Sequence, residues 1–204
     1  MQWSAGKAQR ISKIPAPCRP VFKNPPFRHG MIASDNDFWS DHKMTLRILA
    51  TGGTFDKQYD EISGALVFGE CHLPQVIERA RITAPVVLEV LFLLDSLDMQ
   101  ASHREQVLAA CRAATETRIV IIHGTDTMAE TAQVLGAAML DKTIVLTGAM
   151  VPYAVGSSDA LFNFGFACGV AGVLPAGVHV AMNGTVFAWD KVRKNRVAGR
   201  FEAG

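Results

Sequence analysis

Residues 46–54 read LRILATGGT, and residues 118–127 read RIVIIHGTDT. In both stretches an apolar run of strand length leads into a glycine turn that carries threonine. The carboxyl ends of parallel strands share one edge of an α/β sheet, and ligands bind at that edge. The two turns therefore predict two threonine hydroxyls at one crevice, with the carboxylate of Asp126 beside one of them, an arrangement suited to nucleophilic chemistry.

The chain around these stretches alternates between strand and helix patterns. The other strand-like runs are 86–94, 143–147 and 178–182, and the helix-like stretches are 103–115, 127–139 and 158–171. Asn183-Gly184, which follows the last strand-like run, is a strong signal for a two-residue hairpin turn. The pattern predicts one three-layer α/β domain with a mostly parallel sheet.

Three local features follow from the same pattern. Thr127 and Glu130 have the spacing of a capping box, so we expect them to satisfy the first free amides of their helix. Met139, at the far end of that helix, lies on its apolar side and is expected to point inward. Residues 55–60, which follow the first glycine turn, are polar enough to predict a mobile loop.

The composition limits the classes of protein that this chain can represent. Its 204 residues suit one domain, and 49% hydrophobic against 19% charged residues is enough to form a buried sheet. Residues 1–43 carry a net charge of +4, whereas residues 44–204 carry −3. The folded part therefore lacks a broad basic surface, and we expect no nucleic-acid partner.

Residues 1–43 differ in character from the rest of the chain. They contain five of the nine prolines, several basic residues and no apolar periodicity. We expect a disordered Pro/basic extension here and a catalytic α/β domain over 44–204, with translation beginning at Met44 as a further hypothesis. The prolines disfavour the amphipathic helix that an organellar presequence needs.

The cysteines and the hydropathy of the chain indicate the cellular compartment in which the protein is expected. Cys18, Cys71, Cys111 and Cys168 show no paired spacing, and the last two lie in apolar helical patterns. Reduced, buried thiols are therefore expected, as in a cytoplasmic protein. No apolar run approaches the roughly 18 residues of a membrane span, so we expect no membrane association.

Each motif also has a purely structural interpretation. A Thr-Gly-Gly-Thr turn alone is a weak signal, although its glycines would let a ligand approach the backbone closely. Tyr59 is more often a surface aromatic than a catalytic phenol, and His123 more often a hydrogen-bonded structural residue than a base. A nucleotide-binding fold is the weaker alternative, because the glycine patterns that hold phosphates are absent.

A threonine nucleophile needs a base, and lysine is the candidate type. Lys142 begins a strand and so lies at the wrong edge of the sheet. Lys191 and Lys194 follow the hairpin and can fold back toward the crevice, although composition alone favours a solvated basic end. Asp95-Ser96, at the end of strand 86–94, adds a carboxylate and a hydroxyl suited to gripping the charged ends of an amino acid.

Taken together, these blocks resemble the bacterial-type L-asparaginases, a family of threonine amidohydrolases. The matching blocks are residues 48–54, residues 123–130 (HGTDTMAE), residues 148–150 with Ser158, Asp159 and Asn163, and residues 182–183 leading to Lys194. They occur in the family's order and cover most of residues 46–196. The resemblance implies the fold of the N-terminal domain of these enzymes, in the short, single-domain branch.

The resemblance also implies roles for particular residues. Thr54 matches the nucleophile, with Tyr59 as its neighbour on a lid. Lys194 matches a base that Asp126 holds in place. Thr125 matches the group that positions the water or the oxyanion. Further matches concern the substrate: Ser96 and Asp126, with Thr125 beside them, grip its α-carboxylate and α-amine, and the carbonyl of Ala149 recognises the leaving amide nitrogen.

The chain departs from the family at three points. Family members usually continue into a second domain that supplies a glutamate to the neighbouring subunit's site, whereas this chain ends ten residues after Lys194. Leu97 stands where many members carry a polar substrate-binding residue. The segment between Thr54 and Tyr59 is shorter than usual, so the tyrosine is the less secure match.

The resulting hypothesis is a cytoplasmic asparaginase that hydrolyses L-asparagine to L-aspartate and ammonia through a threonine acyl-enzyme, with some activity on L-glutamine. It implies no metal, no organic cofactor and a homo-oligomer, either dimer or tetramer. The alternative from another class is a non-catalytic amino-acid-binding α/β module. A role beside a tRNA amidotransferase is less favoured, because the acidic core offers no tRNA-sized basic face.

Overall fold

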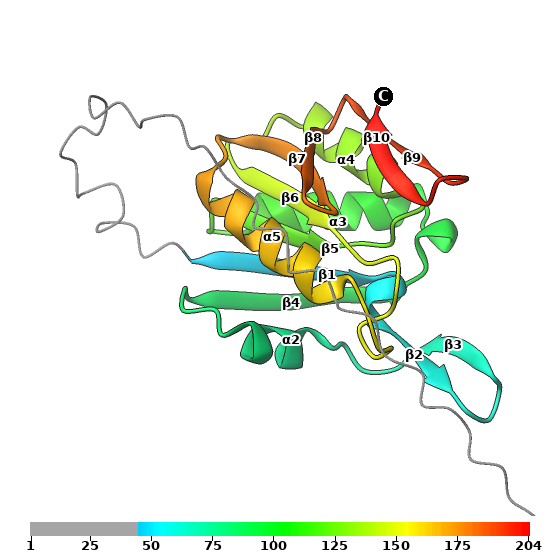
Figure 1. Ribbon diagram of the computed structural model, residues 1–204. Helices are drawn as coiled ribbons and strands as arrows, with labels where there is room; N and C mark the ends of the chain where they lie inside the picture. Colours follow the sequence, from blue (N-terminus) through cyan, green and yellow to red (C-terminus); the bar gives the residue numbers. More distant parts are fainter. Residues whose placement is uncertain (1–44) are drawn as a thin grey trace, which may run out of the picture. The chain divides into compact units, whose positions relative to one another are not determined.

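The computed structural model describes residues 45–204, which belong to a compact unit that spans Asp41–Gly204. The expected extension over 1–43 and the hypothesis about Met44 lie outside the described residues. The six-stranded sheet has the order β4 (Val86–Leu94), β1 (Leu46–Gly52), β5 (Arg118–Ile122), β6 (Thr143–Thr147), β7 (Gly177–Met182) and β8 (Thr185–Ala188) (Figure 1).

Five of these strands are parallel, and only β8 runs antiparallel to its neighbour. The turn between β7 and β8 is formed by Asn183 and Gly184, both with positive φ (51° and 79°), as a two-residue hairpin turn of this kind requires. The mostly parallel sheet and the hairpin predicted from the sequence are confirmed.

Helices cover both faces of the sheet. One face packs against α3 (Ala101–Ala113) and α4 (Met128–Ala137), and the other against α2 (Leu73–Ala80) and α5 (Ala160–Val173) (Figure 1). Side chains alternate between the faces, so that Ile119 and Ile121 of β5 join the first core while Val120 and Ile122 join the second. The central strands β1, β5 and β6 are therefore buried on both sides, as in a three-layer domain, whereas the edge strand β4 stays partly exposed.

The strand order creates a switch point between β1 and β5. From β1 the chain steps outward to β4, then returns past β1 to β5 and continues to β6 and β7. Ligands in doubly wound sheets bind beside the carboxyl ends of the two strands where the direction reverses. Those ends carry the two Thr-Gly turns, so the topology places both at the expected ligand crevice.

The crossover from β6 to β7 has the opposite hand to the others. It steps in the same direction as β5 to β6, yet its helix, α5, packs on the opposite face from α4. Such reversals are rare among parallel connections. Here the reversal carries residues 148–159 toward β1, where the amide of Tyr153 donates to the carbonyl of Phe55 at 3.1 Å.

Two small hairpins complete the described chain. One joins β2 (Lys57–Asp60) to β3 (Ala65–Phe68) and projects from the body of the domain, and the other joins β9 (Val192–Asn195) to β10 (Arg200–Ala203) (Figure 1). Short 3-10 turns, η1 (Thr54–Asp56) and η2 (Ser96–Asp98), follow β1 and β4. The expectation of a mobile polar loop at 55–60 is wrong, because antiparallel pairing with 65–68 orders this segment.

Two other local expectations are also wrong. The hydroxyl of Thr127 donates to the carbonyl of Ser96 at 2.7 Å, and Glu130 pairs with Arg104 at 2.8 Å, so neither side chain caps α4. Both side chains bind residues of other segments instead of the first amides of the helix. Met139 is 88% exposed, because the helix ends at Ala137 and the positive φ of Met139 (45°) turns its side chain outward.

No helix within residues 45–204 has the length and apolarity that crossing a bilayer demands.

Candidate active site

The two glycine turns lie in direct contact. Gly53 has a φ of 72°, and a methyl group added to it would collide with the backbone of Gly124. A methyl group on Gly124 would in turn collide with the side chain of Ser96. The turns after β1, β4 and β5 are therefore packed closely together, which brings the peptide segments of Thr54, Ser96 and Thr125 to one edge.

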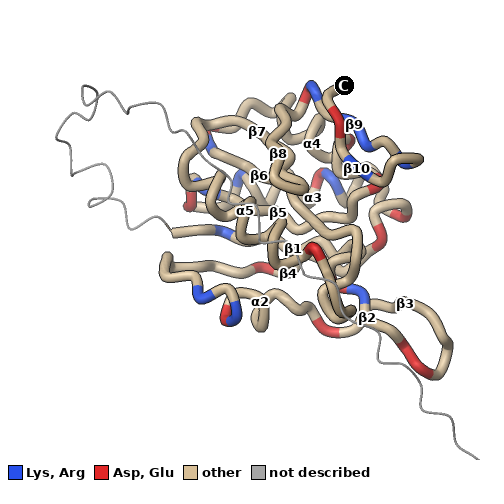
Figure 2. The backbone as a smooth tube through the Cα atoms, viewed as in Figure 1, with Lys and Arg blue, Asp and Glu red and all other residues tan. Residues whose placement is uncertain are grey.

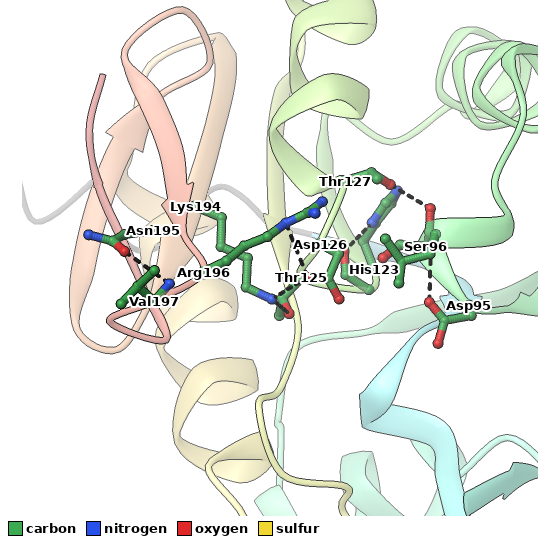
Figure 3. A network of polar contacts seen from close by, with 12 residues as sticks. Asp95, Ser96, His123, Thr125, Asp126, Thr127, Lys194, Asn195, Arg196 and Val197 are labelled. Atoms are coloured by element: carbon green, nitrogen blue, oxygen red, sulfur yellow. Dashed lines mark hydrogen bonds and ion pairs between the residues drawn. The ribbon is translucent and has the colours of Figure 1, made fainter.

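Lys194 reaches this edge from the C-terminal hairpin. Its Nζ donates to Thr125 Oγ1 at 2.7 Å and to Asp126 Oδ1 at 2.8 Å (Figure 3). Its side chain is only 10% exposed. The alternative of a solvated basic end is wrong for Lys194, whereas Lys191 is exposed.

The local sequence explains why Lys194 points inward. Val192 and Lys194 share one side of β9, since strand side chains alternate. Val192 and Phe201, which pairs directly with Lys194, both join the core of the domain. Burial of these two apolar side chains anchors the hairpin and directs the lysine stem toward Thr125.

The end of β4 adds a second group of polar residues. Ser96 is 1% exposed, and Asp95 accepts hydrogen bonds from the Leu97 amide at 3.0 Å and from Lys57 Nζ at 2.5 Å. Partial burial raises the pKa of Asp95, but the Lys57 contact, the amide and the charge of Lys194 outweigh it and leave the pKa below its ordinary value. Asp95 thus stays ionised beside Ser96.

His123 is a structural residue rather than a base. Its Nδ1 lies 2.7 Å from the carbonyl of Gly124 and its Nε2 lies 2.8 Å from Thr131 Oγ1. A carbonyl only accepts, so Nδ1 carries the proton and Nε2 accepts from the threonine. Complete burial lowers the pKa of His123 to about 4, which keeps the ring neutral.

The loop after β6 is fixed by two polar side chains of the α5 region. Asp159 accepts from the amides of Met150 and Val151 at 3.0 Å each, and Asn163 Nδ2 donates to the carbonyl of Gly148 at 3.0 Å. Ala149, between these anchored residues, is 1% exposed. Its peptide is therefore held in a defined orientation.

Thr54 and Tyr59 occupy different environments. Thr54 is half-buried at the start of η1, beside the contact between the glycine turns. Tyr59 lies on β2 and is 64% exposed, with no hydrogen bond from its hydroxyl to any residue of 45–204. The structure thus groups Thr125, Asp126 and Lys194 and brings the segments of Thr54 and Ser96 beside them, but it does not bring Tyr59 into this group.

Sequence reasoning missed two charged residues that follow the first glycine turn and make tertiary contacts. Lys57 ties the first residue of β2 to Asp95, and Asp56 is completely buried, where it accepts from the His72 amide at 2.8 Å. Burial raises the pKa of Asp56, although the His72 contacts oppose it. Both residues lie in the segment predicted to be a mobile loop, although Asp56 ends η1 and Lys57 begins β2, and no sequence signal marked either of them.

The polar groups of the crevice are hydroxyls, carboxylates and ammonium groups. The described residues contain no group of three or more His, Cys, Asp or Glu side chains placed to hold a metal ion. A hydroxyl beside a lysine and a carboxylate is the composition of an acyl-transfer site.

Comparison with known proteins identifies the family of the chain. The family model described as Asparaginase, N-terminal, matches residues 45–202. The glutaminase-asparaginase of Acinetobacter glutaminasificans is 32% identical over 165 residues, which cover 74% of this chain and 50% of that protein. A glutamyl-tRNA(Gln) amidotransferase subunit of Pyrococcus furiosus is 33% identical over 147 residues, or 69% of this chain and 34% of that protein.

The solved structures that match this chain are also asparaginases. The thermostable L-asparaginase of Thermococcus kodakarensis matches with a TM-score of 0.70 and 28% identity, over 78% of this chain and 51% of that chain. A probable cytoplasmic L-asparaginase of Campylobacter jejuni matches with a TM-score of 0.64 and 31% identity, over 74% of this chain and 49% of that chain. The chain spans half or less of the length of the curated relatives described above. It belongs to the asparaginase family, with residues 45–202 as the N-terminal domain of that family.

Proposed function

We propose that this protein hydrolyses the side-chain amide of L-asparagine to L-aspartate and ammonia, with some activity on L-glutamine. The observation that carries the proposal is the placement of Lys194 Nζ, within hydrogen-bonding distance of both Thr125 and Asp126. These residues adjoin the glycine turn that bears Thr54. A module that only bound an amino acid would have no use for a lysine held against a threonine hydroxyl.

The proposed reaction has two steps. The oxygen of Thr54 attacks the amide carbon, the carbon–nitrogen bond breaks, and the nitrogen leaves as ammonia with the hydroxyl's proton. Water then cleaves the resulting ester, which releases the acid and restores the hydroxyl. Lys194, in its neutral form, acts as the base, Asp126 holds it in place, and Thr125 positions the water or the developing oxyanion.

In this proposal the substrate is held by groups at the same edge. Ser96 and Thr125 contact the α-carboxylate, Asp126 faces the α-nitrogen, and the anchored carbonyl of Ala149 accepts from the amide nitrogen. Tyr59, on the projecting hairpin, is proposed as the neighbour of the nucleophile. The fixed loop after β6 supports the assignment of Ala149.

Ammonia release from L-asparagine, D-asparagine and L-glutamine tests the proposal. We expect the wild type to act on L-asparagine and Thr54→Ala to lose a factor of about 10² or more, as is usual when a group needed in the transition state is removed. Thr83→Ala, at an exposed threonine, is the matched control. Unchanged turnover in Thr54→Ala would end the proposal, and tight binding of L-asparagine without ammonia would favour the non-catalytic module.

A second candidate is the amidase part of a tRNA-dependent amidotransferase. It is favoured by the archaeal relatives described as glutamyl-tRNA(Gln) amidotransferase subunits. The net charge of −3 over residues 44–204 argues against a tRNA surface. A gel-shift titration with tRNA distinguishes the two, because an independent asparaginase gives no shift at physiological salt.

We further propose a cytoplasmic homo-oligomer. Cys71, Cys111 and Cys168 are free thiols, and burial raises their pKa values to about 11, 12 and 12, which leaves them unreactive. One solved relative is described as a probable cytoplasmic enzyme. Light scattering of the purified protein measures the oligomer, and a mass of one chain would contradict the proposal.

A further inference from the structure

The turn that bears Thr54 is too short to fix its own geometry. η1 has only three residues, and it follows two glycines with positive φ, Gly52 at 91° and Gly53 at 72°. Before the turn, the amide of Gly53 donates to the carbonyl of Leu94 at 2.9 Å. The orientation of Thr54 therefore depends on how the other two residues of η1 are held.

Phe55 holds η1 to the loop after β6. It is completely buried, and its carbonyl accepts from the amide of Tyr153 at 3.1 Å. The two rings stack with their centroids 6.4 Å apart, and Arg79 of α2 donates to the Tyr153 hydroxyl at 2.9 Å. One side of the turn is thus fixed by packing and by a backbone hydrogen bond.

Asp56 holds η1 to the start of α2. Figure 2 shows acidic residues over much of the domain, but among those of residues 45–204 only Asp56 is completely buried. Its Oδ1 accepts from the amide of His72, the residue directly before α2, at 2.8 Å. The Nδ1 atom of His72 lies 3.7 Å from the same oxygen, and Cys71 Sγ lies 3.9 Å from Oδ2.

A buried carboxylate is an unfavourable choice for packing alone. Phe55 and Leu73, the neighbours of Asp56 and His72 in the chain, both join the core on the α2 and α5 side. Removing a carboxylate from water is unfavourable unless hydrogen bonds and opposite charge compensate for it, and burial raises the pKa of Asp56. The free amides at the start of α2 supply part of that compensation. What the carboxylate adds over an apolar residue is a directed bond from η1 to a helix.

We propose that Asp56 is a positioning residue for the Thr54 hydroxyl, a role that rests on the amide hydrolysis proposed above. Its bond to the His72 amide anchors η1 and so holds the hydroxyl in place beside the crevice. The residues assigned to substrate binding follow β4, β5 and β6, and none belongs to η1. Loss of the anchor therefore slows the attack on the amide without weakening binding, since a displacement of about 1 Å can lower a rate by about 10²-fold.

The test compares Asp56→Ala with Asp56→Asn, which keeps an oxygen that can accept from the His72 amide. Below both melting temperatures, we expect Asp56→Ala to lower kcat/KM for L-asparagine by about tenfold or more, and Asp56→Asn to stay within about threefold of the wild type. The dissociation constant of L-aspartate, measured by calorimetry, should change by less than about twofold in both variants. Unchanged kcat/KM in Asp56→Ala, equal losses in both variants, or weaker binding that accounts for the loss would overturn the inference.

Asp56→Leu replaces Asp56→Ala if the alanine variant does not fold. Leucine fills the space of the carboxylate with an apolar group, which often preserves stability at buried charged positions. It cannot accept from the His72 amide, so the same loss of kcat/KM is expected. A leucine variant with the turnover of the wild type would refute the anchor.

Arg118→Met is the matched control for loss of stability. Arg118 begins β5, at the edge of the sheet opposite the crevice, and its partly buried side chain donates to the carbonyl of Leu174 at 2.7 Å. We expect this variant to have a lower Tm but a kcat/KM within about twofold of the wild type. A loss of kcat/KM as large as that of Asp56→Ala would show that instability alone explains the effect, against the positioning role.

Amide hydrogen exchange separates failure of this inference from failure of the proposed hydrolysis. Faster exchange over 53–57 in the Asp56 variant that lacks the acceptor, but not in Arg118→Met, would show the anchor even if the wild type released no ammonia. Absence of ammonia would then refute only the hydrolysis. Ammonia release by the wild type, with exchange and kcat/KM unchanged in that Asp56 variant, would refute the positioning role and retain the enzyme.

Discussion

Lys194 is one of five basic residues within residues 191–200, and its side chain is 10% exposed, whereas those of Arg193, Arg196 and Arg200 are between 62% and 69% exposed. Composition alone could not single it out. What distinguishes it is the strand alternation with Val192 and the core position of Phe201, which appear only once β9 and β10 pair. The role proposed for this lysine was therefore accessible from family resemblance and not from the local sequence.

At the residue scale, His123 gives a prediction about pH and stability. Its folded pKa, about 4, lies below the value of 6.5 for a free histidine because the ring is completely buried. Between these values the unfolded chain takes up a proton that the folded state rejects, so the free energy of unfolding falls as the pH falls, by about 3 kcal/mol from this residue. Above about pH 6.5 the term vanishes.

Urea denaturation of the wild type and of His123→Gln at about pH 7 and pH 4 measures this term. The variant, which also loses the contacts to Gly124 and Thr131, should be less stable at neutral pH. Its stability should change less on acidification than that of the wild type, because the carboxylates contribute equally to both proteins. Parallel pH dependences would show that His123 is not buried in its neutral form.

At the element scale, the sequence located the strands and helices of the sheet but missed the hairpin at 57–68. The central parallel strands are apolar runs that bury both faces, and the edge strand β4 is apolar apart from Glu89, which makes all five visible as sequence patterns. The hairpin strands have four residues each, and none of these residues is fully buried. β3 is a short apolar run, but its partner β2 is almost entirely polar, so the two strands share no pattern that marks them as a pair. The capping box failed for a related reason, since Ser96 and Arg104 compete for its side chains.

The hairpin gives the second prediction. Lys57→Met removes the Lys57–Asp95 pair, which joins the base of the hairpin to the segment before Ser96. We expect faster amide hydrogen exchange over 57–68 and a higher KM for L-asparagine, with a global loss of only about 1 kcal/mol, since the pair is partly exposed. Lys191→Met, at an exposed lysine, serves as the control. Exchange that is unchanged over this segment would refute the proposed anchoring.

At the scale of the whole molecule, the fold class and the shared edge of the two Thr-Gly turns followed from the sequence. The order of the strands did not, because it depends on which face each helix covers. The reversed crossover through α5 illustrates this limit. Its helix contains no charged residue, so periodicity gives no indication of which side faces the sheet.

The third prediction concerns the boundary of the catalytic unit. We propose that residues 44–204 fold and act without the preceding segment, since every residue assigned to the site lies within the Asp41–Gly204 unit. A chain that begins at Met44 should melt within about 2 °C of the full chain and release ammonia at the same rate. A truncated chain that aggregates or loses activity would refute this division.

We infer that the Thr54 hydroxyl and the Lys194 amine serve one reaction. A double-mutant cycle in kcat for ammonia release, from Thr54→Ala, Lys194→Met and the double variant, measures their coupling, with Lys191→Met as the control. If the two groups act as a unit, each single variant loses about 10² or more and the double variant is no slower than the worse of the two. Losses that multiply in the double variant, or normal turnover in Lys194→Met, would contradict the claim.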